Sequence, residues 1–115
     1  MLAQDSLIHA TTREIWEAQA ASGAYLPPGF DREGFIHCCH PPQLETVFGK
    51  HFGNVEVVML LVIDAARVTP EIKYERAPSA EDDYPHIYGA LDVSAVIDTI
   101  DIRRDGPTWT IAPDL

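Results

Sequence analysis

The alternation of apolar and polar residues near the N-terminus predicts a strand that leads into a helix. Leu7–Ala10 is a short apolar run, and Thr11–Glu14 after it has the S/T-x-x-E spacing of a helix capping box. The helix is expected over about Thr12 to Ser22, with Gly23 as the left-handed residue just past its end. The apolar face of this helix should pack on a sheet.

A second strand and a second helix are predicted next. The Tyr25–Gly29 segment holds two prolines and should be extended, whereas Gly34–Cys39 indicates a strand that Pro41 and Pro42 end. The second helix is expected to begin at Pro42, because proline suits the first helical position. Its apolar stripe consists of Leu44, Val47, Phe48 and Phe52, and Gly53-Asn54 should end it.

The second half of the chain is predicted to consist of strands. Val55–Ile63 is the most apolar segment and should lie centrally in the sheet, and Asp64–Val68 should form one capped turn. Further strands are expected at Ile72–Glu75, Pro85–Gly89, Val96–Ile102 and Thr108–Ile111, the last two joined as a hairpin through Asp105-Gly106-Pro107. Helices early and strands late give an α+β fold.

Length and composition favour one domain over residues 1–115, since 46% of the positions are hydrophobic and no linker or repeat interrupts them. The longest apolar run, Val57–Ile63, is too short to cross a bilayer. The N-terminus has no basic segment followed by an apolar one, as a secretory signal would. We therefore expect a cytoplasmic protein with no membrane partner; the sequence does not indicate its oligomeric state.

The charge balance limits the partners. Eighteen acidic residues against eight basic ones give a formal net charge of −10. Such a surface repels a polyphosphate backbone, so binding to an extended nucleic acid is not expected. A small anionic ligand held by local dipoles stays compatible with this charge.

Three of the five histidines, His9, His37 and His86, fall inside short predicted strands. Each taken alone is equally compatible with a structural role, satisfied by a backbone carbonyl, and with a role facing a ligand. Three together favour a shared site. His40 and His51 are expected to be solvated residues of a loop or helix.

The sequence His37-Cys38-Cys39-His40 has zinc-ligand residue types at an unsuitable spacing. Contiguous strand residues alternate between faces, so the four side chains cannot converge, and no metal is expected. Cys39 precedes a helix start, where a nucleophilic thiolate can form, but no oxyanion motif accompanies it. Packing of both cysteines in the core is favoured.

Polar and aromatic residues are dense in two later segments, Tyr74–Arg76 and Asp82–Gly89. Pro85 restrains the backbone before His86, and Gly89 would let a ligand or a neighbouring chain approach closely. These segments form either the edge of a pocket or a strand edge whose tyrosines cap the core.

Four of these segments together resemble a known family. They are Ile8-His9-Ala10-Thr11-Thr12 with Trp16, Glu33-Gly34-Phe35-Ile36-His37-Cys38, Tyr74-Glu75, and Pro85-His86-Ile87-Tyr88-Gly89-Ala90-Leu91. In order and separation, over about residues 7 to 102, they resemble domain-of-unknown-function family 952. That family is similar to a small, divergent branch of the ADP-ribosyltransferase fold, shared by poly(ADP-ribose) polymerases and RNA 2′-phosphotransferases. The resemblance implies a small mixed, split β-sheet with two main helices.

The resemblance also implies a ligand, NAD or another molecule containing ADP-ribose, and assigns residues to it. His9 would hydrogen-bond the nicotinamide ribose, with Thr11 and Thr12 beside it at a helix N-terminus. Phe35 or His37 would lie near the nicotinamide face. The far wall would hold His86 and Tyr88, and Gly89 would be a further cofactor-binding residue. An arginine such as Arg13 would meet the pyrophosphate.

If the chain is an NAD-dependent ADP-ribosyl transferase, His9, Glu75 and His86 would be its catalytic residues. Glu75 would stabilise the positive charge that develops as nicotinamide leaves. Two other functions stay open: a non-catalytic domain that binds a nucleotide or other small metabolite, and a protein-interaction domain with structural histidines. The fold class alone does not choose among the three.

Overall fold

The computed structural model describes residues 3–78, 80–106 and 108–109, and its largest sheet has four strands. The strand order is β1 (Leu7–Thr11), β4 (Val57–Ile63), β8 (Val96–Asp105) and β9 (Thr108–Trp109). β4 lies between β1 and β8, as its apolar sequence predicts, and six of its seven residues are buried. The predicted hairpin pairs Arg104 with Trp109; Thr110 and Ile111 lie outside the described residues.

Two smaller sheets accompany the large one. One has the order β3 (Ile36–His37), β6 (Tyr84–Ile87), β5 (Ile72–Glu75), and the other pairs β2 (Ala24–Tyr25) with β7 (Leu91–Asp92). The expected split of the sheet is present, but every strand pair in the described part is antiparallel, so the mixed sheet is wrong. Parallel neighbours need a crossover within one sheet, and the two main helices link strands of different sheets.

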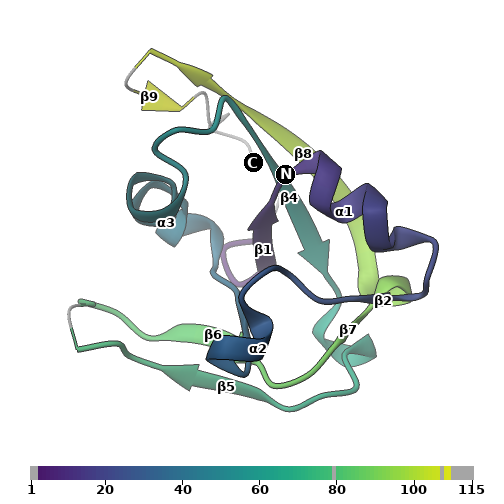
Figure 1. The fold of residues 1–115 in the computed structure, drawn as a ribbon. Coiled ribbons are helices and arrows are strands. Elements are labelled where there is room, and N and C mark those ends of the chain that lie inside the picture. The colour runs from purple at the N-terminus through teal and green to yellow at the C-terminus, as the bar shows by residue number, and fades with distance from the viewer. Residues whose placement is uncertain (1–2, 79, 107, 110–115) are drawn as a thin grey trace.

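Helices α1 (Arg13–Ala20) and α3 (Leu44–His51) flank the large sheet on opposite sides (Figure 1). Both were predicted at greater length; α3 follows a 3-10 turn at Pro41–Gln43. Two more 3-10 turns cover Ala65–Arg67, where Asp64 is the predicted cap, and Val93–Ala95. None of the helices in the described ranges is long and apolar enough to cross a membrane.

A third helix, α2 (Phe30–Glu33), was not predicted. It has only four residues, fewer than a helical hydrophobic period needs to be visible. Glycines with positive φ bound it on both sides, Gly29 at 91° and Gly34 at 83°. Gly34 was assigned to a strand over Gly34–Cys39, but its left-handed backbone ends a helix, and β3 keeps only two residues of that range.

The predicted capping box of α1 is shifted by one residue. Thr12, not Thr11, is the N-cap, and its hydroxyl accepts a hydrogen bond from the Ile15 amide at 3.4 Å. Thr11 is the last residue of β1, and the two-residue period places its side chain on the same face as His9. Its hydroxyl therefore faces the interior. Glu14 takes no part in the cap.

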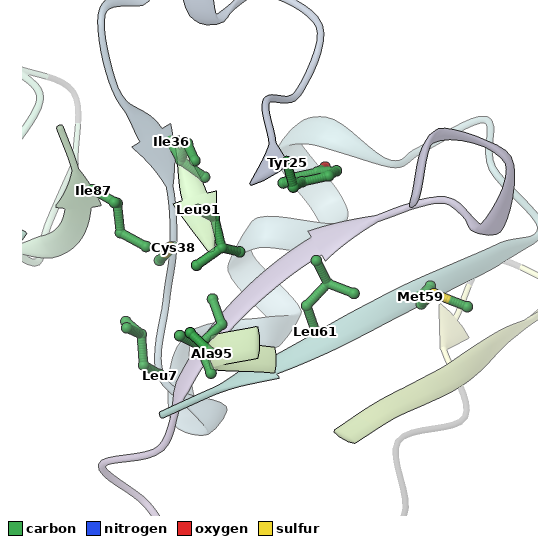
Figure 2. Close-up of a cluster of buried hydrophobic side chains, with 10 residues drawn as sticks. Leu7, Tyr25, Ile36, Cys38, Met59, Leu61, Ile87, Leu91 and Ala95 are labelled. Atoms are coloured by element: carbon green, nitrogen blue, oxygen red, sulfur yellow. The ribbon is translucent and has the colours of Figure 1, made fainter. Parts of the chain in front are cut away.

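The core lies on both faces of β4. Met59, Leu61 and Ile63 point to the side of α1 and the two small sheets, while Val58 and Leu60 point to the side of α3. Figure 2 shows the first cluster, in which Leu61 lies among residues from six other strands or turns. The members of that cluster are Leu7, Tyr25, Ile36, Cys38, Met59, Leu61, Ile63, Ile87, Leu91 and Ala95.

Replacing Leu61 by alanine should destabilise the fold by about 2 to 5 kcal/mol, because its fully buried side chain would leave a cavity between the sheets. The free energy of unfolding in urea measures this loss. Ile97→Ala is the control, since Ile97 is 58% exposed on β8 and its truncation should cost less than about 1 kcal/mol. Equal losses in the two variants would contradict this account of the core.

Candidate functional site

A cavity of about 670 Å³ opens where the β1 edge of the large sheet and the β3 sheet separate. One isolated bridge joins them, in which Ile8 and Cys39 exchange two backbone hydrogen bonds of 2.9 and 2.7 Å. Beyond this bridge α2, α3 and the β5–β6 hairpin complete the walls. The volume is in the range of small-molecule sites.

One face of the β3–β6–β5 sheet carries the chemistry of this cavity. His37 pairs directly with His86, and His86 pairs with Lys73 on the other side. Residues two positions away share the same face, which brings Phe35, Tyr88 and Glu75 beside the paired histidines. The opposite face holds Ile36 and Ile87, both fully buried. Strand alternation thus gathers residues that are up to 53 positions apart, from Phe35 to Tyr88, into one wall.

Glu75 is the best-organised acidic residue of the cavity. Its Oε1 accepts a hydrogen bond from His86 Nδ1 at 2.9 Å and a second one from the Tyr88 hydroxyl. These donors, Tyr88 first and then His86, hold the pKa of Glu75 below its usual value. No hydrogen-bond partner of Oε2 is found among the described residues, so this oxygen is available to a ligand.

Aromatic rings surround Phe35. Its ring stacks on His86 with a centroid separation of 4.0 Å and an interplanar angle of 15°. His37 contacts Phe35 edge to face at 4.8 Å, and Tyr88 lies tilted at 5.4 Å. Such a cluster offers apolar, planar surface beside the Glu75 carboxylate.

His9 lines the cavity, yet both of its ring nitrogens are engaged within the protein. Nδ1 lies 2.5 Å from the carbonyl oxygen of His37, and Nε2 lies 2.9 Å from the Tyr25 hydroxyl. Burial lowers the pKa of His9 to about 4, so the imidazole is neutral at pH 7. The carbonyl can only accept, so Nδ1 carries the proton and Nε2 accepts from Tyr25.

The same chain of hydrogen bonds fixes Thr11. The Tyr25 hydroxyl also lies 2.9 Å from Thr11 Oγ1, and once its single proton goes to His9 the Thr11 hydroxyl becomes the donor of that bond. Tyr25 is fully buried, and burial raises its pKa to about 12. A ligand can therefore reach a ring nitrogen of His9 only by replacing Tyr25, and the nearer role of His9 is to hold the His37 backbone.

His37 itself is exposed and pairs with Glu33 of α2. Its ring centroid lies 6.1 Å from that of His51, at the C-terminal end of α3. His51 was expected to be a solvated helix residue, but it lines the cavity; desolvation and the nearby His37 and Lys50 lower its pKa. The three elements β3, α2 and α3 thus meet around His37.

Eight of the nine predicted site residues line the cavity: His9, Thr11, Thr12, Phe35, His37, Glu75, His86 and Tyr88. Gly89 does not; a Cβ at that position would lie 2.8 Å from Pro70 of the same chain, so its small size serves an internal contact. Arg13 also lies elsewhere. Its guanidinium is 2.5 Å from the carboxylate of Asp101 on β8, and neither residue lines the cavity.

Several lining residues were missed. Thr46 and Lys50 of α3 lie outside every segment singled out in the sequence for its chemistry. Glu33, Arg76 and Tyr84 lie inside such segments but were given no role of their own. The apolar stripe of α3 indicated only the side of the helix that packs in the core. The polar residues Thr46 and Lys50 lie four positions apart, so they share a face of the helix. That spacing was the available signal.

The two cysteines are buried on different sides of the chain. Cys38 packs in the cluster with Leu61, and Cys39 in the cluster with Phe48. Burial raises the pKa of the Cys39 thiol to about 12 and that of Cys38 as well, which opposes a nucleophilic thiolate. Over residues 3–78, 80–106 and 108–109, no three His, Cys, Asp or Glu side chains are grouped to hold a metal ion.

His40 differs from its expected solvated state. Its Nδ1 lies 2.8 Å from the Ser6 carbonyl oxygen, and its Nε2 lies 2.9 Å from the Tyr74 hydroxyl. Because a carbonyl only accepts, Nδ1 is the donor to Ser6. His40 and Tyr74 border a second, shallower hollow of about 420 Å³ with Asp5, Asp82 and Asp83. Its acidic rim holds none of the predicted site residues.

The burial of neutral His9 predicts a pH dependence of stability. The pKa of His9 in the folded protein, about 4, lies below the ordinary histidine value of 6.5, so between these values the unfolded chain binds the extra proton and stability falls as the pH is lowered. From pH 7 to 5 this contribution amounts to about 2 kcal/mol. Urea unfolding should show this loss in the wild type and its absence in His9→Gln. An equal loss in both proteins would contradict the neutral, buried state of His9.

Comparisons with known proteins identify the fold and the family. The crystal structure of protein CC0527 from Caulobacter crescentus is similar over 95% of this chain and 96% of that chain, with a TM-score of 0.81 and 24% identity. The solution NMR structure of CC0527 gives a TM-score of 0.77 and 25% identity over 95% and 94% of the two chains. No curated protein matches the chain in sequence. The family model described as "Protein of unknown function (DUF952)" matches residues 10–99, and the chain belongs to this family.

Proposed function

We propose that the cavity binds a nucleotide such as NAD or another ligand containing ADP-ribose, with Glu75 directed at the ribose. The observation that carries this proposal is the state of Glu75. Its Oε1 accepts from His86 and Tyr88, its Oε2 has no hydrogen-bond partner among the residues that the structure describes, and it lies in the wall of the cavity. A carboxylate fixed in this way suits a hydroxyl donor or a positive charge on a ligand.

The aromatic cluster supports a planar ring as the second element of the ligand. Phe35, stacked on His86 and bordered by His37 and Tyr88, gives a flat apolar surface within the same cavity as Glu75. Nucleobases and nicotinamide are planar, and stacking on an aromatic side chain favours them by about 1 to 3 kcal/mol. A ring joined to a ribose therefore matches this wall.

The resemblance to ADP-ribosyltransferases gives a reaction consistent with this wall. NAD, when bound, supplies a glycosidic bond whose cleavage leaves positive charge on the ribose. Ionised Glu75 would stabilise that charge, and the bonds from His86 and Tyr88 keep the carboxylate in one orientation at no further cost during reaction. α2 and α3 enclose the cavity and would limit the access of water.

One observation favours the second function, non-catalytic binding of a small metabolite. His9 would touch the ribose in a transferase, and here both of its ring nitrogens are bonded inside the protein. A pocket that only binds needs no free nitrogen at this position. Release of nicotinamide from NAD separates the two functions, because only the transferase breaks the glycosidic bond.

Binding can be tested through the aromatic wall. NAD or ADP-ribose at 100 times the dissociation constant should stabilise the protein by about 2.7 kcal/mol, which a thermal shift detects. Phe35→Ala should weaken the affinity about 5- to 150-fold by calorimetry, because it removes the stacking surface. Tyr74→Ala, an exposed tyrosine outside this cavity, should leave affinity unchanged. No heat and no thermal shift at millimolar ligand would favour the protein-interaction account.

Catalysis can be tested at Glu75. Glu75→Gln keeps an oxygen that accepts from His86 and Tyr88 but removes the negative charge. Ligand affinity should change less than about threefold, whereas nicotinamide release should fall about 100-fold or more, because the charge that Glu75 stabilises develops only during reaction. Chromatographic assay of nicotinamide measures this rate. Tight binding of NAD by the wild type without any release would establish the binding domain instead.

A further inference from the structure

Within the part of the chain that the structure describes, the cavity contains one Lys or Arg side chain without an acidic partner, Lys50. The chain has a net charge of −10, and Glu33 and Glu75 both line this cavity. Arg76, the other basic residue of the lining, has its Nε 3.1 Å from Asp83 Oδ1. Among the ion pairs of the described residues Lys50 does not occur, so its ammonium group is available to a ligand.

Lys50 belongs to a polar face of α3 that borders the cavity. Thr46, Val47, Lys50 and His51 all line it, which is the spacing of one helix face. Thr46 and Lys50 are one turn apart, so a hydroxyl donor and an ammonium donor lie along the same ridge. Together they offer hydrogen bonds and positive charge, the combination that suits a phosphate oxygen.

The position of this face relative to Glu75 sets the direction of a ligand. The end of α3 lies next to β3, where the rings of His51 and His37 are 6.1 Å apart. Glu75 is on β5, at the opposite edge of the β3–β6–β5 sheet, about 10 Å away across two strand spacings. A phosphate is repelled by Glu75 and attracted by Lys50, so the anionic end of a ligand belongs at α3 and its ribose at β5.

A purely structural role for Lys50 makes a different prediction. A lysine in the last turn of a helix interacts favourably with the helix dipole and with unpaired carbonyls. That role requires no ligand and would give nucleosides and nucleotides the same affinity. Thr46 and Lys50 both line the same cavity, which favours a ligand-binding role over a purely structural one.

We infer that Lys50 and Thr46 form an anion subsite that binds a phosphate group, so that the cavity takes phosphorylated nucleotides in preference to nucleosides. The inference rests on the proposed function, which supplies the nucleotide as the ligand class. It adds the two residues that bind the phosphate of that nucleotide. It also replaces the expected arginine contact, since Arg13 is bound to Asp101 away from the cavity.

The experiment compares nicotinamide riboside with nicotinamide mononucleotide, which differ by one phosphate. Calorimetry on the full chain should show the mononucleotide binding at least tenfold more tightly to the wild type. Lys50→Met should remove this difference, and Thr46→Val should reduce it, while the affinity for the riboside stays within about threefold in both. Arg103→Met removes one charge from exposed Arg103 on β8, outside the cavity, and should retain the full difference.

Inorganic pyrophosphate is the second probe and separates the two proposals. It should shift the amide resonances of α3 in a two-dimensional NMR titration of the wild type but not of Lys50→Met. The subsite is wrong, and the nucleoside site stands, if the riboside binds and the mononucleotide binds no more tightly. The same conclusion follows if Lys50→Met still binds the mononucleotide more tightly than the riboside. If only pyrophosphate binds, through Lys50, the subsite stands and the nucleotide function falls. No response to any of the three probes would overturn both.

Discussion

The Ile8–Cys39 bridge is the constraint on which the candidate site depends. Two backbone hydrogen bonds join the edge of the large sheet to the small β3 sheet at one point, and beyond that point the sheets diverge. Backbone groups that leave a ladder need other partners when they are buried. The His37 carbonyl finds one in the His9 imidazole, which spans the start of the gap. The cavity exists because the sheets are tied at one end and splayed at the other.

The polar groups in the gap are arranged so that burial costs little. Thr11, Tyr25 and His9 form a chain in which each proton has one acceptor, ending on the His37 carbonyl. A neutral imidazole matches this pattern, whereas a charged one would need a second acceptor in place of the Tyr25 proton. The low pKa of His9 and the geometry of this hydrogen-bond chain therefore both favour a neutral imidazole. Removing Tyr25 would leave a buried nitrogen without a partner, which is costly.

Strand alternation explains why much of the site could be predicted from sequence. Phe35, His37, His86 and Tyr88 lie two apart in pairs within apolar segments, so their shared face follows from the period. The segments Val57–Ile63 and Ile72–Glu75 were equally visible, because they are long or sharply bounded. α2 was not predictable, since four residues show no period and its glycines were assigned elsewhere. The partner of His9 was also hidden: nothing in the sequence places Tyr25 of a two-residue strand against β1.

Charge in the cavity limits what it can bind more than its shape does. The chain is strongly acidic, and two carboxylates line the cavity, so an anionic ligand enters against the overall field. Glu33 is paired with His37, and Glu75 accepts hydrogen bonds from His86 and Tyr88, which fix the orientation of its carboxylate. A ligand that is uniformly negative would therefore be rejected. A ligand that places positive or hydroxyl groups at β5 and negative charge at α3 matches both ends, and a nucleotide with its ribose toward Glu75 has this distribution.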